Sequence, residues 1–192
     1  MNNNPESFCP SDKEDWRNWL ILNHKIKESV WLIIYKKKSD TPNLSWSEAV
    51  DEALCFGWID SLKRPIDSEK YMQYFGKRKP KSTWSKINKE KVEKLIKSGL
   101  MTESGIKSIE IAKQNGSWTI LDSVENLEIP SDLEHELNQS PGSKDFFKSL
   151  SKSIQKAMLY WIISAKRAET RQKRIKEIVD NARHSRKPKQ FG

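Results

Sequence analysis

The sequence is poor in the residues that usually build cofactor, metal and disulfide sites. It has two cysteines, Cys9 and Cys55, and three histidines, too few for a disulfide framework or for a zinc site of finger-like spacing. Glycine is also scarce, at seven residues in 192, and no GxSxG, Walker A or dinucleotide-binding pattern occurs. We therefore expect no metal and no cofactor.

Long apolar runs are absent as well. No stretch approaches the roughly 18 to 20 apolar residues that are needed to span a bilayer. The opening residues, MNNNPESFCP, lack the basic and apolar regions of a signal peptide. These absences predict a cytoplasmic protein without a membrane span.

Tryptophan and positive charge are what the sequence has in quantity. Eight tryptophans and an apolar content of 35% are enough to form a buried core, which argues against a disordered chain. The net charge of +9 lies in two blocks: residues 61–97 carry 12 Lys/Arg against 4 Asp/Glu, and residues 166–192 carry 10 against 3. Such blocks indicate either an anionic partner or, more commonly, solvated helix faces.

The first part of the chain shows both helical and strand patterns. Helices are expected over residues 12–23, 45–57, 88–99 and 103–114, with Asn88 as the N-cap of the third. The run VWLIIY at residues 30–35 is typical of a buried strand, and residues 58–64 and 71–77 should form a hairpin around the turn PIDSEK.

The last part of the chain is expected to be helical. Residues 116–130 have weak periodicity and connect the two parts, and an apolar stripe from Leu150 to Ala165 precedes another helix starting at Ala168. The final residues, SRKPKQFG, should fray. The fold class is therefore α+β and mainly helical, with a small antiparallel sheet in an N-terminal domain, residues 1–125, and a helical C-terminal domain, residues 126–192.

The hairpin should gather aromatic and charged side chains into one candidate ligand-binding cluster. Its members are Trp58, Asp60, Lys63, Arg64, Tyr71, Arg78, Lys79, Lys81 and Trp84. In a regular strand, Trp58, Asp60 and Arg64 would point to the same face. The cluster could bind phosphate or carboxylate groups and stack on a planar ring, or it could consist of core aromatics and paired charges.

A second candidate site is a basic stripe near the start of the last helix. Arg167, Arg171 and Arg174 lie at i, i+4 and i+7, and Lys166 adjoins them. This stripe could contact phosphates, or it could pack against acidic surface of the first domain, which we favour because Arg pairs well with carboxylates. Cys55, near a helix C-terminus, should be a buried, unreactive thiol, and His24 should cap a helix or lie on the surface.

Three segments are distinctive as sequence motifs: EALCFGWIDS at residues 52–61, RKPKSTWSKIN at 78–88 and AKRAETRQKRI at 165–175. Together they resemble the YdeI/OmpD-associated, or bacteriocin-protection, family, and the similarity runs from about Trp16 to Ala182. The resemblance implies a link to envelope proteins and to survival of peptide antibiotics, without assigning roles to residues.

These observations favour a noncatalytic accessory protein, linked to stress or the envelope, that binds an anionic or protein partner. Direct capture of cationic peptides is disfavoured, because a protein of net charge +9 repels them at long range. Two alternatives stay open. One is a nucleic-acid-binding protein that uses both basic blocks, and the other is an enzyme acting on a small acidic or phosphorylated substrate, with Asp60 as the base.

Overall fold

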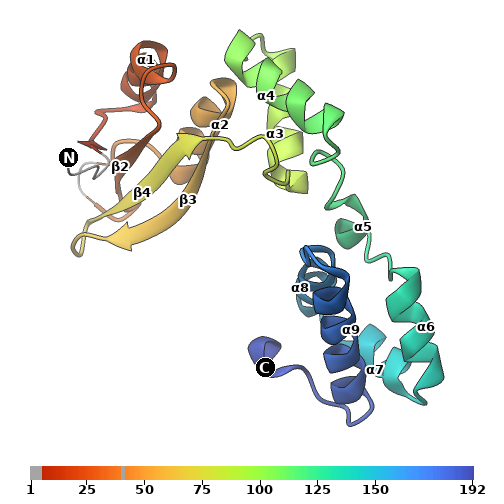
Figure 1. The fold of residues 1–192 in the computed structure, drawn as a ribbon. Coiled ribbons are helices and arrows are strands. Elements are labelled where there is room, and N and C mark those ends of the chain that lie inside the picture. Colours follow the sequence, from red (N-terminus) through yellow and green to blue (C-terminus); the bar gives the residue numbers. More distant parts are fainter. Residues whose placement is uncertain (1–5, 40–41) are drawn as a thin grey trace. The chain divides into compact units, whose positions relative to one another are not determined.

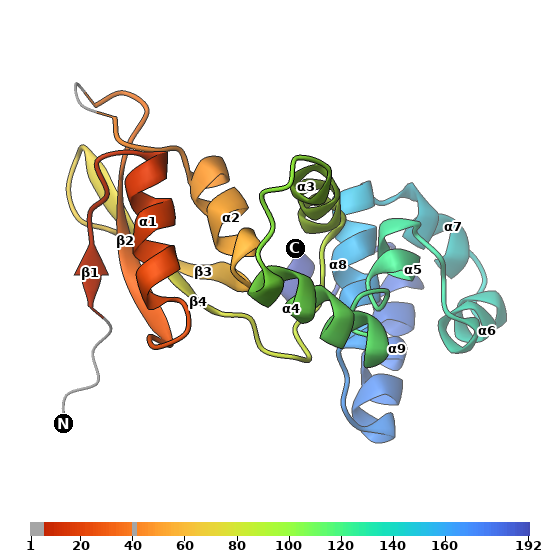
Figure 2. The same cartoon turned by 90° about the horizontal axis from the view of Figure 1, so that it is seen from above.

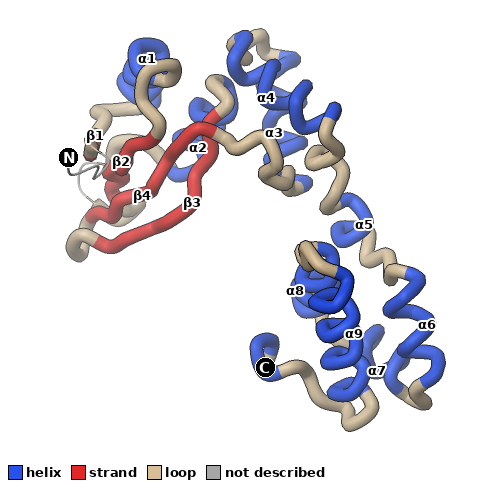
Figure 3. Tube along the Cα trace, viewed as in Figure 1, coloured by secondary structure: helices blue, strands red, loops and turns tan. Residues whose placement is uncertain are grey.

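The chain forms two compact units. A computed structural model describes residues 6–39 and 42–192 (Figure 1). The first unit is Met1–Thr119 and the second is Ile120–Gly192. The described strands all belong to the first unit, whereas the second is built from helices (Figure 3). This arrangement confirms the predicted α+β, mainly helical fold class.

The sheet of the first unit has four described strands in the order β1-β2-β4-β3. They are β1 (Ser7–Phe8), β2 (Ser29–Tyr35), β3 (Trp58–Pro65) and β4 (Lys70–Lys77). β2 and β3 both pair antiparallel with β4, as the hairpin pattern predicts, but β1 pairs parallel with β2. The expectation of a purely antiparallel sheet was therefore wrong, because a two-residue strand has no periodicity from which it could be recognised.

One face of the sheet carries the core of this unit. Val30, Leu32 and Ile34 alternate with partly exposed residues along β2, and all three are buried. Helices α1 (Lys13–Asn23) and α2 (Trp46–Cys55) lie on this side of the sheet, as Figure 2 shows. Their buried residues, among them Trp16 and Leu20, join the same apolar cluster. The β2 residues between the buried ones consequently point to the other face of the sheet.

A β-bulge in β3 changes which side chains share a face. Asp60 pairs with Phe75, but the next aligned pair is Lys63 with Gln73, so β3 contains an extra residue between them. The pairing puts Asp60 and Lys63 on the core side of the sheet and Arg64, opposite Met72, on the other side. The regular alternation expected for Trp58, Asp60 and Arg64 was therefore wrong beyond Asp60.

Two further helices complete the first unit, α3 (Lys86–Lys97) and α4 (Glu103–Gln114). The N-cap of α3 is Ser85, whose hydroxyl accepts from the Asn88 backbone amide, so Asn88 is not the cap that the sequence suggested. α4 contacts the end of α2 closely at Gly105, where an added Cβ would lie 2.3 Å from the Cys55 carbonyl oxygen.

The second unit has its own apolar core. Its helices are α5 (Asp122–Glu125), α6 (Ser131–Gln139), α7 (Ser143–Ser149), α8 (Lys152–Ile163), α9 (Ala168–Ala182) and the 3-10 helix η1 (Lys189–Phe191). The Phe191 ring lies 5.6 Å from the Trp161 ring, so the last residues pack on α8 rather than fray as expected. Among the described residues, no helix is long and apolar enough to cross a membrane.

Candidate functional site

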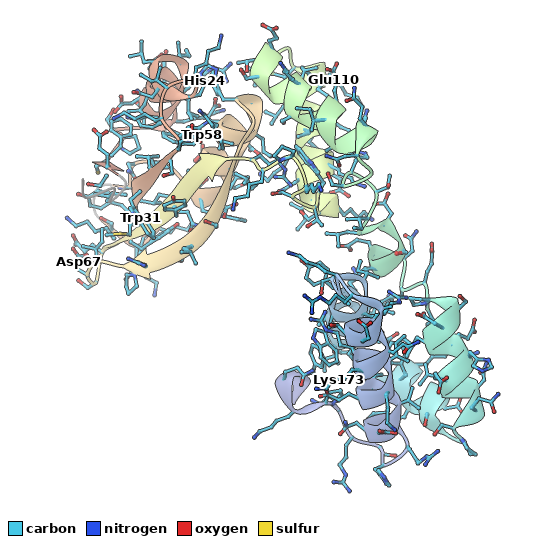
Figure 4. The ribbon with its side chains drawn as sticks, viewed as in Figure 1. His24, Trp31, Trp58, Asp67, Glu110 and Lys173 are labelled. Atoms are coloured by element: carbon cyan, nitrogen blue, oxygen red, sulfur yellow. The ribbon has the colours of Figure 1, made fainter. Side chains whose placement is uncertain are left out.

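A cavity of about 460 Å³ opens in the first unit where the hairpin meets α4. Figure 4 labels two of the residues around it, His24 and Trp58. The residues lining the cavity are His24, Lys25, Phe56, Gly57, Trp58, Lys77, Arg78, Lys79, Pro80, Ser104, Lys107, Ser108 and Ile111. Five of these side chains are Lys or Arg, and none of these lining residues is acidic.

Several parts of the first unit bring these residues together, and the end of α1 contributes His24 and Lys25. The turn between α2 and β3 contributes Gly57, whose φ of +74° favours glycine, and an added Cβ there would lie only 2.9 Å from the Ser104 carbonyl oxygen. The strands contribute the start of β3 and the end of β4, where Trp58 pairs with Lys77. α4 contributes one face, because Ser104, Lys107, Ser108 and Ile111 recur at helical spacing.

The cavity is strongly positive because few of its cations are neutralised. Lys77 forms an ion pair with Glu28 at 2.6 Å. Lys25, Lys79 and Lys107 have no carboxylate partner within the described parts of the chain, and all three are exposed. A concave surface that carries one sign of charge concentrates ligands of the other sign.

Arg78 is the most unusual of these cations. Its guanidinium lies over the Trp84 ring, 3.7 Å from the centroid, and its Nη2 donates to the Thr83 carbonyl oxygen. Its Nε and Nη1 atoms are buried, and neither has a hydrogen-bond partner among the described residues. Burial lowers the pKa of Arg78 to about 10, although nearby Asp60 opposes this effect. Arg78 is thus a desolvated cation in the lining of the cavity, with two buried donors that no described residue uses.

His24 and Ser104 form a hydrogen-bonded pair in the same cavity. The His24 Nδ1 atom lies 2.8 Å from the Leu20 carbonyl oxygen, which can only accept, so Nδ1 carries the proton. In the neutral ring, Nε2 then accepts from the Ser104 hydroxyl at 3.1 Å. His24 is indeed the C-cap residue of α1, but the pair also presents polar atoms to the cavity.

The structure divides the ligand-binding cluster predicted from the hairpin. Trp58, Arg78 and Lys79 line the cavity, and Trp84 is buried beneath Arg78. Lys81 is exposed and is not part of the lining.

Asp60 is not among the residues that line the cavity, although its charge acts on Arg78. Its carboxylate accepts from the Trp46 indole at 2.9 Å and from the Gln73 amide at 3.3 Å.

The remaining predicted residues lie on β3 and β4. The Lys63 ammonium is 3.9 Å from the centroid of the Tyr71 ring, on the core side of the sheet. Arg64 lies on the other side, 4.9 Å from the centroid of the Trp31 ring. The predicted cluster therefore belongs to three separate neighbourhoods, because the bulge puts Arg64 on the face opposite Asp60 and the strands lead Arg78 away from both.

Two arginines of the basic stripe on α9 form bonds within the second unit. Arg171 donates to both carboxylate oxygens of Asp132 on α6, at 2.6 and 2.8 Å. Arg174 donates to the Trp161 carbonyl oxygen and the Ser164 hydroxyl. The described partners of these two arginines lie in the same unit, and the interdomain role of the stripe stays a prediction. Lys166 and Arg167 are exposed.

Cys55 has the unreactive character that its position predicts. It is completely buried, and burial, followed by the nearby Glu52 carboxylate, raises the pKa of its thiol to about 11. Within residues 6–39 and 42–192, no group of three or more His, Cys, Asp or Glu side chains could hold a metal ion.

Sequence reasoning missed the part of the cavity that comes from distant segments. His24, Lys25, Ser104, Lys107 and Ser108 are far from the hairpin along the chain. One signal was available in the sequence: Ser104, Lys107 and Ser108 give α4 a polar stripe with helical spacing. Without the packing of α4 on α2, nothing connected this stripe to Trp58.

Two family models match the chain, one on each side of the boundary between the two units. Residues 8–108 match the model described as a domain of unknown function, DUF8412. Residues 126–184 match the model described as bacteriocin-protection, YdeI or OmpD-associated, which confirms the resemblance noted in the sequence for that part of the chain. No match was found among curated proteins or among solved structures.

Proposed function

We propose that this chain, which belongs to the DUF8412 family through residues 8–108, is a noncatalytic accessory protein whose first unit binds a small anion. Residues 126–184 match the bacteriocin-protection model. The proposed binding site is the cavity between the hairpin and α4. The family description supports an envelope-associated role in protection from bacteriocins. The anion-binding function rests on the chemistry of the cavity.

Arg78 is the observation that carries the proposal. A buried guanidinium with two unpartnered donors is costly, since an unsatisfied buried polar group destabilises a protein by about 1–3 kcal/mol. An oxyanion in the cavity would neutralise the charge of this desolvated guanidinium. The surrounding lysines and the absence of acidic residues from the lining favour the same kind of ligand.

The size of the cavity indicates a small ligand. Its volume of about 460 Å³ lies within the range of sites that hold small molecules, roughly 300–1,000 Å³. Phosphate or carboxylate groups on such a molecule would suit the lysines, and the Ser104 hydroxyl could add a neutral hydrogen bond. The enzyme alternative receives no support here, because its expected base, Asp60, is not among the lining residues.

Isothermal titration calorimetry with inorganic phosphate, pyrophosphate and citrate tests this proposal. We expect at least one of these anions to bind at low salt, and Arg78→Met to weaken that binding about tenfold or more, the equivalent of roughly 1.4 kcal/mol. Lys81→Met is the matched control, because Lys81 belongs to the same basic block but lies outside the lining. The absence of binding, or equal losses in both variants, would contradict the proposal.

A further inference from the structure

The sheet face opposite α1 and α2 gathers aromatic rings. By strand register, Trp31 and Tyr35 of β2 and Tyr74 of β4 point to this face, because their neighbours Leu32, Ile34, Tyr71 and Phe75 are buried in the core on the other side. Trp31 and Tyr74 are paired across the strands, with ring centroids 5.0 Å apart at an interplanar angle of 77°. All three rings are partly exposed.

Two cations extend over these rings. The Arg64 guanidinium is 4.9 Å from the centroid of Trp31, and the Lys70 ammonium is 5.7 Å from the centroid of Tyr35. Arg64 is present here because the bulge turns its side chain away from the core side. We call Trp31, Tyr35, Tyr74, Arg64 and Lys70 the aromatic face.

The aromatic face is positively charged. The other residues that the register assigns to this side of β2 and β4 are Ser29, Ile33, Met72 and Gly76, so these two described strands place no carboxylate on it. Lys70 forms an ion pair with Asp67 in the turn, at 3.8 Å. Both partners of that ion pair are substantially exposed, and exposed pairs of this kind contribute little and are screened by salt.

We propose that the aromatic face binds single-stranded nucleic acid. Exposed rings on a sheet offer platforms for unpaired bases, and a stacked base contributes about 1–3 kcal/mol with little dependence on its identity. Arg64 and Lys70 are placed to meet the phosphates beside those bases. In a duplex the bases are already stacked on one another, so this surface discriminates against double-stranded nucleic acid.

This site is separate from the proposed anion-binding cavity. The cavity lining contains none of the residues of the aromatic face. Failure to bind anions in the cavity would therefore not decide whether the aromatic face binds nucleic acid. The Arg78→Met variant should bind oligonucleotides as the wild type does.

Fluorescence anisotropy with labelled oligouridylate and oligothymidylate of about 12 nucleotides, a length within the range of single-strand binding sites, tests the inference. We expect single strands to bind more tightly than a duplex of the same length. Trp31→Ala should weaken binding about tenfold, the loss of roughly one stacked base. Trp46→Ala is the matched control, because Trp46 is 45% exposed but contacts Asp60 on the other side of the sheet.

Arg64→Gln provides a second readout that does not depend on removing a large ring. Arg64 is exposed, so the fold should tolerate the change, and the slope of log affinity against log salt should fall by about one phosphate contact. Equal affinity for duplex and single strand, or binding that Trp31→Ala leaves unchanged, overturns the inference. Displacement of the oligonucleotide by polyglutamate at equal affinity also overturns it, in favour of an acidic protein partner.

Discussion

Arg78 combines a charged group with burial. Its stem and guanidinium pack on Trp84, which is 1% exposed, while two of its donors have no partner in the described chain. Replacement of a buried charge by an apolar side chain of similar length is often stabilising. A group that is unfavourable in the folded protein and placed in a cavity is typical of a binding site.

Arg78→Met should therefore raise the free energy of unfolding by about 1 kcal/mol while it weakens anion binding. Methionine keeps the contact with the Trp84 ring but has no donors to leave unsatisfied. Urea denaturation followed by tryptophan fluorescence measures the change. If the variant were less stable than the wild type, the hydrogen bond to Thr83 would outweigh the desolvation of the guanidinium, and Arg78 would be a structural residue.

The ion pair between Asp132 on α6 and Arg171 makes the stability of the folded protein depend on pH. The hydrogen bonds from Arg171 lower the pKa of this carboxyl group below its usual value. The carboxylate therefore stabilises the folded state above the pKa of the unfolded chain, near 4, and this contribution is lost as the pH falls through the lower folded pKa.

The Asp132→Asn variant tests this linkage. At pH 7 it should be less stable than the wild type by about 1 kcal/mol or less, because the pair is partly exposed. Near pH 2 the difference should shrink as the wild-type carboxyl group becomes protonated. Thermal unfolding of both proteins across this range measures the difference, and a gap that does not change with pH would show that charge is not its cause.

At the scale of elements, the contact between α4 and the end of α2 positions one wall of the cavity. Thr102, the N-cap of α4, donates through its hydroxyl and its backbone amide to the Cys55 carbonyl oxygen, at 2.7 and 3.0 Å. Gly105 then allows the helix backbone to approach the same carbonyl. Ser104 and Lys107 reach the cavity as a result of this approach.

Gly105→Ala should destabilise the protein, although Gly to Ala inside a helix normally stabilises by about 0.5–1 kcal/mol. The new methyl group would lie 2.3 Å from the Cys55 carbonyl oxygen and 2.7 Å from Met101 Cε, so α4 must shift. We expect a loss of about 2 kcal/mol in urea denaturation. Glu110→Ala, at an exposed position of the same helix, should stay within about 0.5 kcal/mol of the wild type.

Elements whose signal is local could be predicted from the sequence. The β-branched and aromatic run VWLIIY and the turn PIDSEK identify β2 and the hairpin, and Ser45 and Glu48 form a capping box at the start of α2. Features for which the local sequence allows two equally good structures could not be predicted. Ser85 and Asn88 are both good caps, and the residues Ser61 and Leu62 in β3 contain nothing that marks a bulge.

The candidate site could be predicted only in part, because the hairpin brings some of its residues together and the packing of distant helices brings the others. Trp58 and Arg78 are close because the hairpin brings the ends of β3 and β4 together, and a hairpin is visible in the sequence. His24 and Ser104 are 80 residues apart, and their hydrogen bond depends on how α1 and α4 pack. The aromatic face depends on the bulge that places Arg64 beside Trp31.

At the scale of the whole molecule, the two units have separate apolar cores. One contains Trp16 and Phe75, and the other contains Leu133 and Ile178. The salt bridge between Arg171 and Asp132 and that between Lys156 and Glu125 both lie inside the second unit. A unit with its own core and its own paired charges has what it needs to fold independently.

Residues 120–192, expressed alone, should keep a helical circular dichroism spectrum and unfold cooperatively. With 73 residues this unit is near the lower limit for a single unsupported core, so we expect a stability of only about 3–5 kcal/mol. Residues 1–119 form the matched fragment and should retain the Trp31 and Arg78 sites. A fragment 120–192 without cooperative unfolding would show that this unit depends on the first.

The bulge in β3 has a consequence for how copies of the protein behave in concentrated solution. β3 is the last strand in the order of the sheet, and such edges can recruit a strand from another molecule and start aggregation. Here the ladder is interrupted between Asp60 and Lys63, and Lys63, Arg64 and Pro65 follow at once. An incoming copy of this strand would meet a broken register, like charges and a missing amide donor. The irregularity that turns Arg64 toward Trp31 thus also protects the protein from edge-to-edge assembly.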